Sequence, residues 1–147
     1  MATLGSRLVG TWRLVSREDR TPDGELRVDP GLGSDPVALL VYDAAGNFAA
    51  QFMKRGRTTT TLRTSTGAGE NNSVAIGGYD AYFGTYTVDE GTGSVTQRLL
   101  GALSPTDIDK VVTREMHVDD DRLTIHLATR GVEGEPITRT LIWERLA

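Results

Sequence analysis

The chain has 147 residues, of which 38% are hydrophobic and 24% charged, and its net charge is −4. This size is typical of one domain over residues 1–147, and interleaved charges of net negative sign exclude the concentrated basic face that nucleic acid or anionic membranes require. Because there is no cysteine, the sequence also excludes a thiolate catalyst, a cysteine-ligated zinc and a disulfide framework.

The N-terminal part of the chain predicts a short capped segment followed by a strand. Residues 1–5 carry no apolar run of signal-peptide length and no later stretch could span a bilayer, so we expect a cytoplasmic protein. Ser6 is a candidate cap for a short turn or helix that ends near Val9. Residues 10–16 then alternate in character, which predicts the first strand, and Glu18 continues its inward-facing register.

Turn residues divide the next part of the chain into strands. Residues 21–24 read Thr-Pro-Asp-Gly, in which proline fixes φ and glycine accepts a positive φ, and a short strand over 25–28 follows. The clearest hairpin joins strands at 37–42 and 47–53 through the turn at 43–46. These segments predict antiparallel neighbours joined by short connections.

The inner face of this hairpin is partly fixed by its sequence. Phe48 and Phe52 mark the inner face of the second arm, because successive strand side chains point to opposite faces. The facing of Leu40 and Tyr42 depends on whether the turn carries a bulge, and both facings stay open.

Residues 54–78 lose the alternating pattern and include a run of four threonines at 58–61. So long a connection inside a compact domain is unusual and tends to be functional or mobile. We interpret it as a lid or portal segment, with a disordered loop as the alternative, and it could hold a short helix near residues 70–76.

The stretch at residues 81–88 predicts the central strand. Its alternation places Tyr82, Gly84, Tyr86 and Val88 on one face. Aromatic and β-branched residues suit a pleated sheet, and we expect the glycine to leave room beside the two rings. This face therefore becomes the predicted lining of a cavity.

The remainder of the chain continues as strands separated by short turns. Gln97 and Leu99 alternate with polar neighbours and face inward in the first of these strands. We predict the strands at residues 94–103, 111–118, 123–128 and 137–146.

The register of one late hairpin decides the facing of an arginine. We predict that Val118 faces Leu123 across the hairpin turn. That register directs Arg114 and Met116 inward, and it places both histidines of the chain outside, so no metal site is expected there.

About eight to ten antiparallel strands with short turns and no convincing amphipathic helix predict an all-β barrel or sandwich. A closed up-and-down barrel removes the exposed edges that a flat sheet would leave. Eight strands also enclose enough volume for one small ligand. We therefore expect a barrel with an internal cavity.

Three short motifs stand in order along the chain: Gly-Thr-Trp within residues 8–16, Tyr-Phe-Gly-Thr-Tyr at residues 82–86 and Trp-Glu-Arg at residues 143–145. They resemble the opening strand with Gly-x-Trp, the Tyr-x-Gly-Thr-Tyr and the terminal Trp-Glu-Arg of the lipocalin-like domain family of small bacterial and fungal β-barrels. The resemblance covers nearly the whole chain and implies an antiparallel up-and-down barrel. It also implies that Trp12 closes one end and that Arg145 packs over the Trp12 ring.

The chain departs from this family at one place. Family members often carry Val-x-His-His after the strand that follows the tyrosines, and this chain has Gln97 there, within Val-Thr-Gln-Arg. Glutamine can donate and accept hydrogen bonds, but it cannot shuttle a proton at neutral pH.

Arg114 is the most informative candidate for function. A guanidinium in a barrel interior is costly to bury unless an anion accompanies it. The anion could be Glu18, or it could be a ligand carboxylate or enolate. Arg139 raises the same question with less force, because we expect it to reach water from near a strand end.

Our leading hypothesis is binding of a small apolar or aromatic molecule inside the barrel, without a metal or cofactor. The partner is then a small-molecule ligand or substrate, and a homodimer stays open. The expected ligand contacts are Tyr42, Phe48, Phe52, Tyr82, Tyr86, Gln97, Leu99, Arg114 and Met116.

The alternative is a biosynthetic isomerase, cyclase or lyase that encloses a polyketide-like or terpenoid substrate of secondary metabolism. Arg114 would stabilise a developing oxyanion, and Glu18 or a phenol of lowered pKa would move the proton. Tyr82 and Tyr86 are the candidate phenols, and their other reading is as core residues with hydroxyls bonded to backbone. A third hypothesis is an assembly role through an exposed strand or apolar patch.

Overall fold

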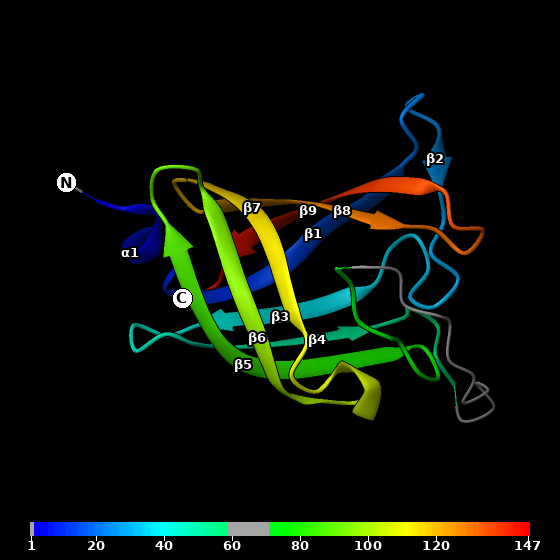
Figure 1. Ribbon diagram of the computed structural model, residues 1–147, viewed down its shortest axis with the longest axis horizontal. Helices are drawn as coiled ribbons and strands as arrows, with labels where there is room; N and C mark the ends of the chain where they lie inside the picture. The colour runs from blue at the N-terminus through cyan, green and yellow to red at the C-terminus, as the bar shows by residue number, and fades with distance from the viewer. Residues whose placement is uncertain (1, 59–70) are drawn as a thin grey trace.

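The computed structural model describes residues 2–58 and 71–147 (Figure 1). The chain begins with helix α1 (Leu4–Leu8), capped by Thr3, whose hydroxyl accepts from the Ser6 amide at 3.1 Å while the Thr3 amide donates to Ser6 Oγ at 3.0 Å. The helix therefore begins before Ser6, and the prediction that Ser6 caps it is wrong. Ser6 instead completes a reciprocal capping box.

Nine strands follow in the described part of the chain, interrupted there by one short 3₁₀ turn, η1 (Pro105–Asp107). The first predicted strand is longer than expected, because it continues to Arg20, whereas the predicted hairpin at 37–42 and 47–53 has the observed bounds. The strands are β1 (Gly10–Arg20), β2 (Leu26–Arg27), β3 (Val37–Tyr42), β4 (Asn47–Met53), β5 (Tyr79–Asp89), β6 (Ser94–Ala102), β7 (Val111–Asp119), β8 (Arg122–Arg130) and β9 (Pro136–Arg145).

The sheet closes on itself. Its strand order is β2-β1-β3-β4-β5-β6-β7-β8-β9, every neighbouring pair is antiparallel, and β1 also pairs with β9. Eight strands therefore form an up-and-down barrel, as predicted, while the two-residue β2 is an extra strand against the end of β1. Figure 1 shows β1 and β9 running side by side across the barrel wall.

The hairpin registers settle two questions of facing. Pairing of β3 with β4 is continuous from Val37 to Tyr42, without a bulge, and both Leu40 and Tyr42 are buried. Val118 pairs with Leu123, as predicted, so Arg114 and Met116 are buried in the barrel.

Strand β1 contains a β-bulge opposite β9. Leu14 pairs with Trp143 and Ser16 pairs with Ile142, so Val15 is an extra residue on β1 with no partner on β9. An extra residue shifts all later side chains of the strand to the opposite face.

This bulge determines which polar groups enter the barrel. Trp12 is buried ahead of it, whereas Arg17 and Asp19 are the buried residues beyond it, and Glu18 between them is exposed. The prediction that Glu18 faces inward is therefore wrong, because the simple alternation from which it came does not continue through the bulge.

Gly84 on β5 also differs from expectation. A Cβ atom there would lie 1.8 Å from the Arg98 carbonyl oxygen of β6, next to a register shift between Phe83 and Gly84. The glycine therefore permits a close approach of two backbones, and it does not leave an open gap beside the tyrosine rings.

The barrel is closed at the end that carries α1. Trp12 is fully buried, and its Nε1 donates to the Leu8 carbonyl at 2.9 Å. The Arg145 guanidinium carbon lies 4.2 Å from the centre of the Trp12 ring, and Arg145 also donates to the carbonyls of Val9 and Arg7. These contacts agree with the capping role that the resemblance implied for Trp12 and Arg145.

The connection between β4 and β5 is described only at its two ends. Residues 71–76 form a turn and an extended segment with no helix, so the predicted helix near 70–76 is not found there. Residues 59–70, on which the lid interpretation largely depends, lie outside the described residues. Within the described part of the chain, no helix has the length and apolar character needed to cross a membrane.

Candidate functional site

A cavity of about 110 Å³ occupies the barrel interior and extends to the end opposite Trp12. Segments around β2, the β8–β9 turn and residues 72–75 surround its opening. Its wall includes these buried apolar residues: Leu32, Leu40, Ala50, Phe52, Ala75, Ile125, Leu127, Ile137, Leu141 and Trp143.

Five of the nine predicted ligand contacts line this cavity. They are Tyr42, Phe52, Tyr82, Gln97 and Arg114. The other four lie outside its lining and pack in or against the core: Phe48, Tyr86, Leu99 and Met116.

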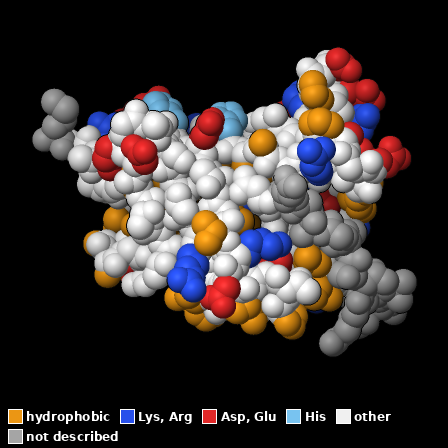
Figure 2. All heavy atoms as spheres, viewed as in Figure 1, with side chains coloured by type: hydrophobic (Ala, Val, Ile, Leu, Met, Phe, Trp, Pro, Cys, Tyr) orange, Lys and Arg blue, Asp and Glu red, His pale blue; other side chains and the backbone are white. Residues whose placement is uncertain are grey.

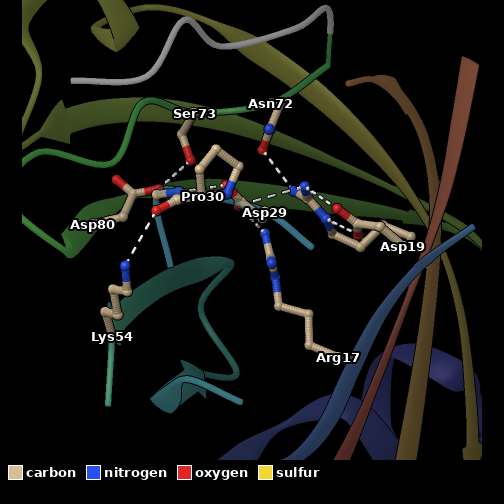
Figure 3. Close-up of polar contacts among 10 residues, drawn as sticks. Arg17, Asp19, Asp29, Pro30, Lys54, Asn72, Ser73 and Asp80 are labelled. Carbon is tan, nitrogen blue, oxygen red and sulfur yellow. Dashed lines mark hydrogen bonds and ion pairs between the residues drawn. The ribbon is translucent and has the colours of Figure 1, made fainter. Parts of the chain in front are cut away.

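A layer of paired charges crosses the cavity near its opening (Figure 3). Arg17 Nη2 donates to Asp29 Oδ2 at 2.9 Å, and Arg139 donates to both oxygens of Asp19, at 2.7 and 3.0 Å. Arg139 also lies 3.7 Å from Asp29, so the four side chains form one network. Charges buried in this way are tolerated because each has a partner and hydrogen bonds.

Arg139 is therefore part of the buried network. The expectation that it reaches water from near a strand end is wrong. It is 6% exposed, and its forked contact with Asp19 joins β9 to β1. Burial by itself would raise the pKa of Asp29, but Arg17 and Arg139 lower it by more, so the net pKa is below its ordinary value.

The segment that leads into β5 is fastened across this charged layer. The Asn72 side-chain oxygen accepts from Arg139 Nη1 at 3.1 Å, and Ser73 Oγ donates to Asp80 Oδ2 at 2.5 Å (Figure 3). The Val74 amide donates to Asp107 Oδ2 at 2.8 Å. These contacts place Asn72 and Ser73 in the cavity wall.

Asp80 is a buried carboxyl that our sequence reasoning did not single out. It is 3% exposed, and no described residue forms a hydrogen bond with its Oδ1. Burial, with a smaller effect from Asp107 and against the hydrogen bond from Ser73, raises the pKa of Asp80 to about 6.

Arg114 differs from the other two buried arginines of the cavity. Its Nη1 donates to the carbonyls of Asn71 at 2.8 Å and Thr113 at 3.1 Å. Among the described residues no carboxylate forms an ion pair with it. Glu18, the partner suggested by the sequence, is exposed and pairs with Arg20 instead.

The phenols lie in different surroundings. Gln97 Nε2 donates to the Tyr42 hydroxyl at 2.7 Å, and burial raises the pKa of Tyr42. Burial likewise raises the pKa of Tyr82 to about 12. Tyr86 donates to the Asp43 carbonyl at 2.6 Å, and burial raises its pKa too. A lowered pKa, which acid catalysis by Tyr82 or Tyr86 would need, is not found.

Aromatic rings form the inner wall beside these phenols. Phe52 stacks with Tyr82 at 6.4 Å between ring centres, and it meets Trp143 edge to face at 5.8 Å. Trp143 is 1% exposed, and its Nε1 donates to none of the residues that the structure describes. The wall therefore offers flat apolar surface with a few unsatisfied polar atoms, which suits a ligand that is mainly apolar.

Sequence reasoning missed the acidic members of this site. Arg17 and Asp19 stand two residues apart, and this spacing indicates that they share one face of the strand. Only the bulge at Val15, which the sequence does not reveal, shows that this face is the inner one. Asp29 lies in a loop, where no alternation exists to be read. Both histidines, His117 and His126, are exposed as predicted.

Within residues 2–58 and 71–147, no group of three or more acidic or histidine side chains could hold a metal ion. A family model described as a lipocalin-like domain matches residues 9–146. Among solved structures, a complex of bovine odorant binding protein with a selenium-containing odorant is similar at 14% identity and a TM-score of 0.48, over 100% of this chain and 75% of that chain. No curated protein matches the chain.

Proposed function

The chain belongs to the lipocalin-like domain family, and from this premise we propose that it binds a small apolar or aromatic molecule inside its barrel. The observation that carries the proposal is a cavity of about 110 Å³ inside a barrel of eight strands, a size whose interior side chains alone can fill. A mostly apolar wall with a few polar groups is the usual composition of small-molecule sites.

Small side chains at two places support this reading. Ala50 on β4 and Ala75 in the following segment are both buried, and both line the cavity. Larger residues at these positions would fill the space, since protein interiors otherwise pack to nearly crystalline density. The space is therefore a property of the side chains that the sequence supplies.

Ala50 and Ala49 provide a matched pair for testing the proposal. Ala50 faces the cavity, and Ala49 is exposed on the outer face of the same strand. We expect the purified protein to bind the neutral aromatic probe N-phenyl-1-naphthylamine saturably, with a rise in probe fluorescence. Ala50→Leu should weaken this binding at least about tenfold, because added methyl groups occupy the site, and Ala49→Leu should leave it unchanged.

Two results would contradict the proposal. One is the absence of saturable probe binding to the folded wild-type protein. The other is equal binding by wild type and Ala50→Leu, which would place the probe outside the cavity. Circular dichroism of each variant shows whether the barrel is retained.

The enzymatic alternative loses the proton carriers on which it depended. Glu18 lies outside the barrel, and burial raises the pKa of Tyr82 and of Tyr86 above the ordinary value. An isomerase or cyclase mechanism built on these groups is therefore not proposed.

Self-association of the chain stays a prediction. Figure 2 shows hydrophobic side chains gathered along the lower face, where β4 and β5 run in Figure 1. Exposed large apolar residues on these strands and on β6 include Met53, Phe83 and Leu100. Sedimentation velocity of wild type and Phe83→Ser would measure whether this face supports a homodimer.

A further inference from the structure

One edge of the Arg114 guanidinium has no described partner. Arg114 is 7% exposed and lines the cavity, yet its two hydrogen bonds both come from Nη1. A guanidinium has five N–H donors on three nitrogens. Its Nε and Nη2 donate to no described residue. Because Arg114 lines the cavity, these two nitrogens are the donors that it can offer to a ligand there.

The pairing of the cavity's other buried charges makes this edge unusual. Arg17 is paired with Asp29, and Arg139 with Asp19, so each of those guanidinium groups has a carboxylate. Arg114 has only backbone carbonyls among the described residues. A buried cation without an anion is unfavourable, so the site is prepared for an anionic partner.

The Tyr82 hydroxyl provides a second donor in the wall of the same cavity. It has no hydrogen-bond partner among the described residues. Burial raises the pKa of Tyr82 to about 12, so the phenol keeps its proton at neutral pH. A phenol that stays protonated at neutral pH donates its hydrogen to an anion.

We propose that the ligand is a small organic acid whose carboxylate binds the free edge of Arg114 and accepts a hydrogen bond from Tyr82. The two nitrogens Nε and Nη2 form the fork that matches two carboxylate oxygens. The apolar body of the acid then lies against Ala50, Phe52 and Trp143, which line the same cavity.

A carboxylate fits this site better than a phosphate group. Among the described buried arginines of the cavity, Arg114 alone lacks a carboxylate partner, whereas a phosphate ester carries up to two negative charges at neutral pH. The acidic residues Asp19, Asp29 and Asp80 also line the cavity and would repel a second negative charge. The single charge and planar shape of a carboxylate satisfy one arginine.

This inference rests on the proposed binding function. Two probes of matched shape distinguish a failure of the inference from a failure of the proposed function. Isothermal titration calorimetry would compare 2-naphthoate with its neutral analogue 2-naphthamide. We expect the wild-type protein to bind the acid at least about tenfold more tightly, because charge-assisted hydrogen bonds are about twice as strong as neutral ones.

Substitutions then assign the preference to the proposed groups. Arg114→Met, which keeps an apolar stem, should weaken naphthoate binding about 10–100-fold and change naphthamide binding less than about threefold. Tyr82→Phe should weaken naphthoate binding severalfold, and it tests the site independently if Arg114→Met fails to fold. Arg122→Met makes the same charge change on the exposed outer face of β8 and should alter neither affinity.

Three outcomes would overturn the inference. Equal wild-type affinities for the two probes, or equal losses of both in Arg114→Met, would leave the arginine with a structural role only. In those two cases the cavity still binds aromatic molecules, so the proposed function survives. If neither naphthyl probe nor N-phenyl-1-naphthylamine binds, the proposed function fails as well.

Discussion

The Asp80 carboxyl shows how burial of one residue affects the free energy of unfolding. Its pKa rises from an ordinary 3.8 to about 6 because burial disfavours the charged form. In the unfolded chain the carboxyl ionises at its ordinary pKa, so between about pH 4 and pH 6 the folded state binds more protons. Asp80 therefore contributes stability below this range, and the contribution is lost as pH rises through it.

We expect this loss to amount to about 3 kcal/mol, the equivalent of a pKa change from 3.8 to about 6. Urea unfolding of wild type and Asp80→Asn at pH 4 and pH 7 measures it, because the asparagine does not ionise. The free energy of unfolding of wild type, relative to that of Asp80→Asn, should be lower at pH 7 than at pH 4. A constant difference would contradict the prediction. Ser73→Ala removes a hydrogen bond that lowers the pKa of Asp80. The loss of stability between pH 4 and pH 7 should therefore be larger in this variant.

Residue by residue, the sequence was informative where strands are regular. Arg114 was assigned to the interior correctly because β7 and β8 pair without a bulge. Glu18 was assigned to the interior wrongly because β1 contains a bulge. Gly84 was assigned the wrong role because the approach of the Arg98 carbonyl depends on the register of β6. Alternation predicts facing only between such irregularities.

Strands β1 and β9 are joined by a buried ion pair as well as by backbone hydrogen bonds. We expect Asp19→Ala to lower the free energy of unfolding by about 3–5 kcal/mol, because Arg139 would keep its buried charge and lose both hydrogen bonds to Asp19. Replacing both residues, as Asp19→Ala with Arg139→Met, should cost less than the sum of Asp19→Ala alone and Arg139→Met alone. Urea denaturation of the three variants measures this coupling.

Additive costs would contradict this prediction and would mean that Asp19 and Arg139 act independently. Arg13→Met is a suitable control, because Arg13 forms an exposed ion pair with Glu144 across the same two strands. Exposed pairs contribute little, so this variant should change the free energy of unfolding by less than about 1 kcal/mol.

The elements themselves were predictable because local patterns determine them. Turn residues at 43–46 and alternation on either side gave the bounds of β3 and β4. Helix α1 was misplaced by a few residues, since the reciprocal bonds of Thr3 and Ser6 allow either residue to be read as the cap. The charged layer was not predictable, because Asp29 and Asn72 reach it from loops.

At the scale of the whole molecule, the barrel depends on contacts between the two ends of the chain. Trp12 pairs with Arg145, and the Thr11 amide donates to the Ala147 carbonyl at 2.9 Å. Proteins dominated by such distant pairings fold slowly, because loop closure precedes the gain from contact. We therefore expect refolding in milliseconds to seconds.

Stopped-flow fluorescence checks this rate without added labels, since Trp12 and Trp143 are both buried and both lie at the seam. Arg13→Met, with its exposed charge pair, should refold at nearly the wild-type rate. Refolding well within a millisecond would contradict the prediction.

Closure was predicted from strand count and from the resemblance of three segments, since short turns between successive strands favour an up-and-down arrangement. The presence of a cavity was expected from eight strands, but its shape was not. It depends on Ala50, on Ala75 and on polar groups that come together from several distant segments.

The unpaired Val15 implies that the two halves of the first strand keep separate frames. Deleting that one residue would straighten the strand and leave Arg17 and Asp19 inside the barrel, because both would keep their partners on β9. Pairing Val15 itself with Ile142 would instead turn Arg17 and Asp19 to solvent and bring Glu18 into the interior. In a comparison of related chains, the pattern of inward and outward residues must therefore be aligned separately before and after this point.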